Sequence, residues 1–181
     1  RKVQASVEVS IYEASDRVGR PILATGNGRC NFSNSDVRGD VYRNAGFVKK
    51  TLGCFEGVFP CGSHCNGVVA FFHNHGMLYR EEGEGRLYPL ANKASVVLDV
   101  LRSACACGSA MGDGGQNGGL SDACSSVQVA ECLNSRVETI KPPLKQDGPF
   151  TLRMADGVFK RADEVILACG GTVARGMLPD S

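Results

Sequence analysis

The six residues from Val7 to Tyr12 constrain the fold most, because polar and apolar side chains alternate along them and the run closes on an acidic residue, Glu13. Such alternation predicts a β-strand. A strand that ends in an acid is typical of dinucleotide-binding βαβ units, in which the carboxylate holds two ribose hydroxyls. The glycine fingerprint of these units lies about 20 residues before the acid, and counting back from Glu13 passes the first residue, Arg1. We therefore expect part of a nucleotide-binding protein that begins inside the motif, with residues 1–6 as the tail of the preceding helix.

Composition and charge exclude several classes of partner. The 181 residues are 43% hydrophobic and 22% charged, which is ordinary for a soluble globular protein. The 20 basic and 19 acidic residues leave a net charge of +1, so no overall field would attract nucleic acid or an anionic membrane. No apolar run approaches the ~20 residues that span a bilayer. The nine cysteines are dispersed and odd in number, which favours reduced thiols in a cytoplasmic protein over a secreted disulfide scaffold.

Four consecutive regions are expected along the chain. They are a partial dinucleotide-binding unit (1–34), a helical and mixed continuation of the same domain (35–102), a flexible Gly- and Ser-rich loop (103–126), and a β-meander with a Gly-Gly strand end (127–181). The loop is predicted to be flexible because its composition cannot offset the entropy lost on ordering.

Helices are predicted over residues 42–59 and 92–102, with Asn92 as the N-cap of the second. Residues 68–73 fit either a strand or a helix. The remaining predicted segments are a long loop (14–34), a solvated charged turn (80–86), strands (76–81, 127–131, 136–140 and 164–168) and a hairpin that joins 150–154 to 158–161.

Residues 25–31, Thr-Gly-Asn-Gly-Arg-Cys-Asn, are the second informative feature. Glycines let the backbone approach a ligand closely and present N–H groups to a phosphate. Arg29 adds a fork of donors that suits phosphate or carboxylate, and Asn31 offers both a donor and an acceptor. Cys30 fits either a redox role or simple packing. A plain surface turn is the alternative for the whole loop, as a solvated strand end is for Glu13.

Three segments resemble one family of proteins: residues 13–34, 84–94 and 162–171. The first includes both the acid at the strand end and the glycine-arginine loop. It is similar to the signature of the aminoacetone-oxidase-type (BaiN-like) flavoproteins, which are NAD(P)/FAD-dependent oxidoreductases. The resemblance extends from residue 1 to about residue 174.

This resemblance implies an α/β fold, namely a glutathione-reductase-like Rossmann FAD-binding domain. The domain is incomplete because its first strand and glycine fingerprint are absent, and it has a β-hairpin or meander near the C-terminus. In such a domain Glu13 would hold the adenosine ribose, and Arg20 would lie beside the nucleotide. The glycine-arginine loop would approach the pyrophosphate and flavin, Val137 would present its backbone to the adenine, and the Gly-Gly strand end would pass close to the cofactor. The implied cofactor-binding residues are Glu13, Arg20, Gly26, Asn27, Gly28, Arg29, Cys30, Asn31, Val137, Ala168, Cys169, Gly170 and Gly171.

The implied function is hydride transfer through FAD between NAD(P)H and an unidentified small-molecule substrate. No residue is identified as a catalytic acid or base, and no metal is expected. The family's inserted substrate domain and C-terminal segment are not found in these residues, so the remainder of the flavoprotein chain would be needed to complete the site. Residues 108–119 are interpreted as an insertion, and Cys169 is a small change from the family pattern.

Two other functions remain open at this point. The chain could be a truncated or degenerate flavoprotein fragment that binds no cofactor and acts by association. It could also be a small zinc-binding interaction domain built on Cys61, Cys65, His73 and His75, although the spacing of these residues is shorter than in typical zinc fingers.

Overall fold

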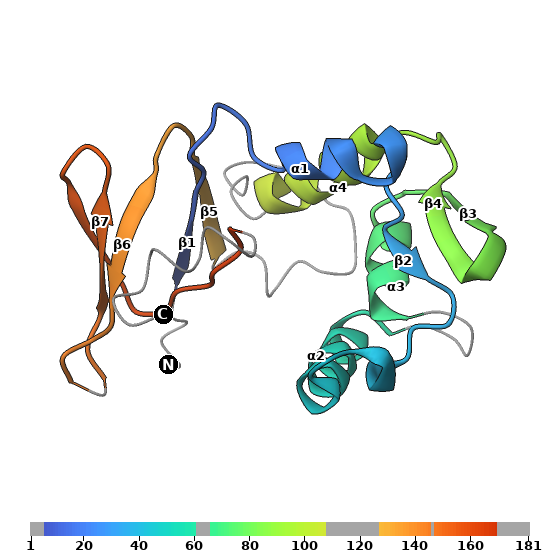
Figure 1. Ribbon diagram of the computed structural model, residues 1–181, viewed down its shortest axis with the longest axis horizontal. Helices are drawn as coiled ribbons and strands as arrows, with labels where there is room; N and C mark the ends of the chain where they lie inside the picture. The colour runs from blue at the N-terminus through green and yellow to red at the C-terminus, as the bar shows by residue number, and fades with distance from the viewer. Residues whose placement is uncertain (1–5, 61–65, 108–126, 146, 170–181) are drawn as a thin grey trace. The chain divides into compact units, whose positions relative to one another are not determined.

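The computed structural model describes residues 6–60, 66–107, 127–145 and 147–169 (Figure 1). The chain divides into two compact units, one built from residues 1–18 and 127–181 and the other from residues 19–126. The described residues form one parallel and two antiparallel sheets together with helices, in agreement with the α/β class. None of the described helices is long and apolar enough to cross a membrane.

The first unit contains two parallel strands, β1 (Val7–Tyr12) and β5 (Val127–Cys132). They pair in register, from Val7 opposite Val127 to Tyr12 opposite Cys132. Parallel strands need a long connection, and here that connection contains the whole second unit. Both predicted strands are confirmed, and they end together at one edge, where Glu13 follows β1.

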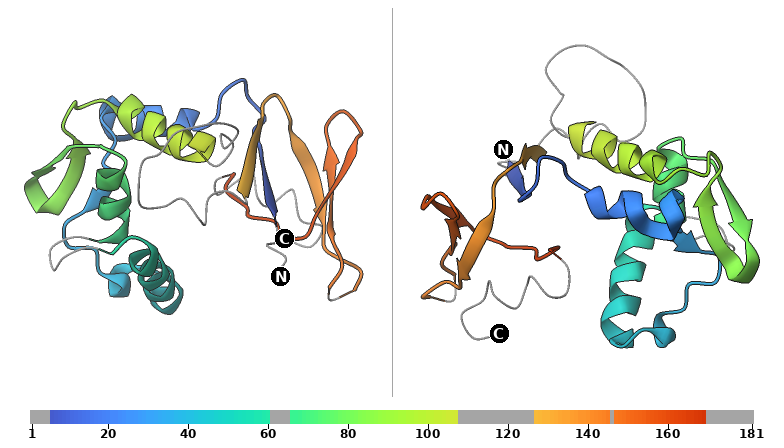
Figure 2. Two further views of the ribbon diagram at one scale, coloured as in Figure 1. Left: turned by 180° about the vertical axis from the view of Figure 1, so that it is seen from behind. Right: turned by 45° about the horizontal axis from the view of Figure 1, so that its top comes forward.

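Three antiparallel strands form the predicted meander in the same unit. β6 (Val137–Lys141), β7 (Phe150–Met154) and β8 (Phe159–Ala162) lie side by side in this order (Figure 2). Alternate side chains of a strand point to the same face, and this buries Ile140, Leu152 and Met154 together. The side chains that pack around them are Tyr12, Val137, Phe150, Ala162 and Val165.

The second unit combines helices with a small sheet. Its helices are α1 (Arg20–Ala24), α2 (Ala45–Val58), α3 (Gly67–Asn74) and α4 (Ala94–Cys107), with 3-10 turns η1 (Thr25–Gly28), η2 (Gly39–Val41) and η3 (Gly83–Gly85). The sheet has the order β2 (Ser33–Asn34), β4 (Arg86–Pro89) and β3 (Tyr79–Glu82). Its core is made by Cys30, Phe72, Met77, Ala94 and Val97.

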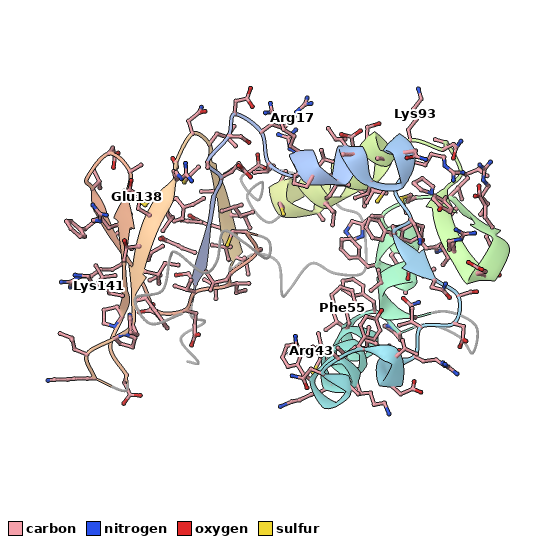
Figure 3. The ribbon with its side chains drawn as sticks, in the orientation of Figure 1. Arg17, Arg43, Phe55, Lys93, Glu138 and Lys141 are labelled. Atoms are coloured by element: carbon pink, nitrogen blue, oxygen red, sulfur yellow. The ribbon has the colours of Figure 1, made fainter. Side chains whose placement is uncertain are left out.

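Helix α3 is anchored at its first turn. The buried Asn66 caps the helix, because its side-chain oxygen accepts a hydrogen bond from the N–H of Val69 at 3.1 Å. Gly67 follows, and a Cβ atom there would lie 2.9 Å from the backbone of Phe55 and Glu56 in α2. The ring of Phe55, which projects from α2 (Figure 3), also contacts Phe71 of α3 with centroids 6.3 Å apart. The two helices therefore meet at a point where only glycine fits.

Two predictions for the second unit differ from the structure, one of them only in part. Residues 14–34 are not one long loop, because α1 begins at Arg20 with Pro21 in its first turn, where the fixed φ of proline fits the helix. The charged segment 80–86 is a solvated turn only in part, because Glu81, Glu84 and Arg86 are exposed whereas Arg80 and Glu82 are half-buried. It lies in β3, η3 and the start of β4, and β4 continues into the buried Leu87, Tyr88 and Pro89 as the central strand of the sheet. The ambiguous segment 68–73 is helical and lies within α3.

Two predicted boundaries also fail. Asn92 does not cap α4, because its φ is +56° and its N–H donates to the carbonyl of Pro89 in a turn, two residues before the helix begins. The predicted flexible loop begins too early, since residues 103–107 are the last residues of α4. The rest of that loop, 108–126, lies outside the described residues.

The apolar segment 164–168 does not form the predicted strand. A strand needs a neighbour to satisfy its backbone N–H and C=O groups, and none of the described strands pairs with this segment. Ile166 is 92% exposed, and only Val165 packs against the meander core. An apolar segment that has no partner strand cannot form the inter-strand hydrogen bonds of a sheet.

Candidate functional site

The acidic strand end of the first unit is rigidly held by its backbone. The N–H of Glu13 donates to the carbonyl of Cys132 at 3.0 Å, and the carbonyl of Glu13 accepts from Ser135 at 2.8 Å. Asn134 then donates to the carbonyl of Ser15 at 2.8 Å. The chain after β1 is thus tied to the turn after β5, at the carboxyl ends of two parallel strands, where ligands bind in open α/β sheets.

The half-buried side chain of Glu13 is oriented by the residue two positions on. Its Oε1 atom accepts a hydrogen bond from the N–H of Ser15 at 2.7 Å. Among the described residues, Oε2 accepts none. The carboxylate is therefore fixed through one oxygen and keeps acceptor capacity for hydroxyl donors such as those of a ribose.

The other predicted cofactor-binding residues of the first unit differ in their exposure to solvent. Val137 is the half-buried first residue of β6, opposite Met154, and it packs on the same core as Tyr12, the residue before Glu13. Ala168 and Cys169 are exposed and lie outside any strand. Gly170 and Gly171 lie outside the described residues.

The glycine-arginine loop of the second unit is an ordered turn. Left-handed φ angles occur at Gly26 (+54°), Asn27 (+54°), Gly28 (+82°) and Cys30 (+60°). The N–H of Arg29 donates to the carbonyl of Gly26 at 3.1 Å, and that of Cys30 donates to Thr25 at 3.1 Å. A left-handed residue other than Gly or Asn costs roughly 1–2 kcal/mol, and such residues concentrate at functional sites. The strained Cys30 backbone thus makes this loop a candidate site.

The side chains of the loop divide between the core and the solvent. Cys30 is 7% exposed and packs against Phe72 and other core residues, so its side chain is a packing element. Asn27 and Asn31 are exposed. Arg20, also exposed, lies at the start of α1, which leads directly into this loop.

Arg29 belongs to a cluster of charged and aromatic side chains, which we call the arginine cluster: Arg29, Arg80, Glu82 and Tyr88. Nη1 of Arg29 donates to both oxygens of Glu82 at 3.1 Å. Nε and Nη2 of Arg80 donate to Oε1 of the same carboxylate at 3.2 and 3.0 Å. The guanidinium of Arg29 also lies over the Tyr88 ring, 4.4 Å from its centroid.

The charges of the arginine cluster shift the pKa of Glu82. Burial alone would raise the pKa of this carboxyl group. The hydrogen bonds and positive charges of Arg29 and Arg80 outweigh that effect and hold the pKa below its usual value. The lowered pKa means that Glu82 carries its negative charge at neutral pH.

Sequence reasoning missed Glu82 because the charged segment 80–86 was interpreted as a solvated turn, and it assigned no role to Tyr88. Strand alternation could have found the first of them. Residues two apart in a strand share a face, so Arg80 and Glu82 of β3 point the same way, and Arg80 pairs with Tyr88 across the hairpin.

The residues considered for zinc form no site in the described part of the chain. Nδ1 of His75 lies 2.8 Å from the carbonyl oxygen of Phe71, and its ring contacts the ring of Phe71. Cys61 and Cys65 lie outside the described residues, and His73 is exposed in the last turn of α3. Within residues 6–60, 66–107, 127–145 and 147–169, no group of three or more His, Cys, Asp or Glu residues could hold a metal ion.

Comparison with known proteins finds similarity to enzymes. No family model matches the chain. The chain is 30% identical over 178 residues to the 3-dehydro-bile acid delta(4,6)-reductase of Clostridium scindens, covering 96% of this chain and 35% of the relative. It is 25% identical over 176 residues to the ribosomal RNA dihydrouridine synthase of Escherichia coli, covering 96% and 36%. The synthase of the same name from Haemophilus influenzae is 27% identical over 99 residues, covering 54% and 22%. The chain thus spans about a third of the length of the first two relatives.

Proposed function

We propose that this chain is part of a flavin-dependent oxidoreductase that binds FAD, as in the aminoacetone-oxidase-type flavoproteins, with a glutathione-reductase-like Rossmann arrangement of the cofactor domain. The observation that carries the proposal is the in-register parallel pair β1–β5 that ends at Glu13. A carboxylate at this edge suits the ribose hydroxyls of a dinucleotide. One oxygen of Glu13 is already oriented by the N–H of Ser15, so binding would order few further atoms.

The second part of the proposal concerns the glycine-arginine loop. Its left-handed turns at Gly26 and Gly28 let a ligand approach the backbone without meeting a Cβ atom. Arg29 supplies donors suited to the pyrophosphate of FAD. Arg20 and Val137 are proposed to lie beside the nucleotide and the adenine, and residues 168–171 close to the cofactor.

The class of reaction is supported by the names of the relatives. A delta(4,6)-reductase and a dihydrouridine synthase are both named for adding hydrogen to a carbon–carbon double bond. When bound, FAD supplies hydride transfer. We propose NAD(P)H as the reductant, an unsaturated small molecule as the substrate, and the cytoplasm as the location. The residues of this chain would bind and orient the cofactor, and the rest of the flavoprotein chain would complete the site.

Replacement of Glu13 tests the ribose contact. In the full-length protein that carries these residues, Glu13→Gln should weaken FAD binding roughly ten- to a hundredfold, because a hydrogen bond to a charged partner contributes about 1.5–3 kcal/mol. FMN has no adenosine ribose, so its dissociation constant should not change. Both constants are measured by quenching of flavin fluorescence.

The matched control is Glu8→Gln, which removes an exposed carboxylate from the same strand. It should leave both dissociation constants unchanged. Equal FAD affinity in Glu13→Gln and the unmodified protein would show that Glu13 is only a solvated strand end.

A further inference from the structure

The arginine cluster lies on one face of the β3–β4 hairpin. Arg80 and Glu82 are two residues apart in β3, and Tyr88 of β4 pairs directly with Arg80. The loop of residues 25–31 reaches this face, since a Cβ atom at Gly26 would lie 3.4 Å from Cε1 of Tyr88. The N–H of Phe32 also donates to the carbonyl of Leu87 at 3.0 Å. Arg29 therefore meets residues that lie more than fifty positions later in the chain.

Arg29 is held from two directions. In the plane of its guanidinium, Nη1 is bound to both oxygens of Glu82. Perpendicular to that plane, the ring of Tyr88 covers one face, and Tyr88 itself is only 5% exposed. An arginine side chain normally loses much rotamer freedom when it binds a ligand. Here that freedom is already restricted in the free protein.

The held guanidinium retains donors for a ligand. Arginine has five N–H groups, and those of Nη1 are directed to Glu82. Among the described residues, Nε and Nη2 of Arg29 make no hydrogen bond. The Arg29 side chain is 34% exposed, so part of it is open to solvent and to an anionic group.

The charge of Glu82 opposes anion binding, and Arg80 offsets this effect. The carboxylate carries one negative charge and binds two guanidinium groups. The three side chains together keep one net positive charge. Glu82 can thus orient Arg29 without turning the cluster into a neutral or acidic surface.

We infer that Glu82 and Tyr88 are positioning residues that hold the Arg29 guanidinium with its Nε and Nη2 edge directed to a diphosphate group. The inference rests on the proposed function, in which that group belongs to FAD. It assigns a role in ligand binding to two side chains that need not touch the ligand. Substitution of Glu82 or Tyr88 should therefore change the affinity for FAD only by changing the position of Arg29.

A double-mutant cycle tests this dependence. FAD dissociation constants are measured by flavin fluorescence in the full-length protein for Glu82→Gln, Arg29→Lys and the double variant. Glu82→Gln should weaken FAD binding about fivefold or more when Arg29 is present. In the Arg29→Lys background, which keeps the charge but loses the fork, it should have little further effect. The inhibition constant of inorganic pyrophosphate, measured by its competition with FAD, should show the same pattern, because pyrophosphate carries the diphosphate group alone.

Matched variants separate positioning from folding. Glu84→Gln breaks the neighbouring exposed pair with Arg86 and should leave both constants unchanged. Tyr88→Phe keeps the ring beneath Arg29 and should bind FAD like the unmodified protein, whereas Tyr88→Leu should weaken binding only when Arg29 is present. The melting temperature of each variant shows whether it is folded.

The outcomes distinguish the inference from the function on which it rests. If the unmodified protein binds FAD but Glu82→Gln has no effect, or weakens binding equally in both backgrounds, the positioning role is overturned and the proposed function stands. If the unmodified protein binds neither FAD nor pyrophosphate, both are overturned.

Discussion

Glu13 and Glu82 are both partly buried carboxylates, but different donors hold them. Glu13 accepts a backbone N–H from its own turn, so its position depends on the local path of the chain after β1. Glu82 accepts from two guanidinium groups, Arg29 and Arg80, so its position depends on charged partners from its own strand and from a distant loop. The charged partners of Glu82 link its ionisation to the stability of the fold.

The lowered pKa of Glu82 predicts a pH-dependent contribution to stability. Because the folded-state pKa lies below the unfolded value of about 4.3, the contribution is fully present above that unfolded value. It is lost as the pH falls through the folded-state pKa. Glu82→Gln should therefore lower the melting temperature at pH 7, and the difference from the unmodified protein should shrink as the pH falls below about 4. Melting curves across this range check it, and a difference that is constant or grows on acidification would contradict the ion-pair account.

At the scale of elements, the contact between α2 and α3 depends on the absence of a side chain at Gly67. A Cβ atom there would lie 2.9 Å from the backbone of Phe55 and Glu56, which cannot move aside as a flexible side chain would. In contrast, Gly53 lies within α2, and nothing lies within 4 Å of a Cβ atom placed there. The two glycines therefore have different roles.

Alanine substitution at these two positions should have opposite effects. Gly67→Ala should destabilise the protein by ~1–3 kcal/mol, because the helices must separate. Gly53→Ala should stabilise it by up to ~1 kcal/mol, because alanine favours the helix. Urea unfolding followed by circular dichroism measures both. Equal effects of the same sign would show that the close contact at Gly67 does not constrain the helices.

Sequence patterns predicted those elements whose signal is local. β1, β5 and the hairpin of β7 and β8 follow from alternation and turn residues, and α2 follows from its length and its end before Pro60. Two of the failures share a non-local cause. Segment 164–168 has the apolar composition of a strand but no partner among the described strands. Segment 86–89 looked charged at its start, yet pairing on both sides makes it the central strand β4.

The candidate site also contains residues that local sequence patterns predict and residues that only the fold brings together. The sequence singled out Glu13 and the glycine-arginine loop, since an acid after a strand and closely spaced glycines are local patterns. It did not find the partners of Arg29, because Glu82 lies 53 residues further along the chain and only the fold of the hairpin places it there. A buried aromatic such as Tyr88 also gives no sign in the sequence that a guanidinium rests on it.

At the scale of the whole molecule, the chain comprises a unit with a parallel strand pair and a meander, and a second unit whose residues lie between the two parallel strands in the sequence. The proposed cofactor residues belong to both units, with Glu13 and Val137 in the first and Arg20 and residues 26–31 in the second. Because the chain spans about a third of its first two relatives, we expect the full-length protein to bind FAD more tightly than these 181 residues alone.

Retention of flavin tests the central claim most directly. The full-length protein is incubated with excess FAD, passed through a gel-filtration column and scanned for absorbance. The account predicts that flavin bands co-elute with the protein and that denaturation releases unmodified FAD, since no covalent attachment is proposed. Protein that elutes without flavin bands after this treatment would contradict the account.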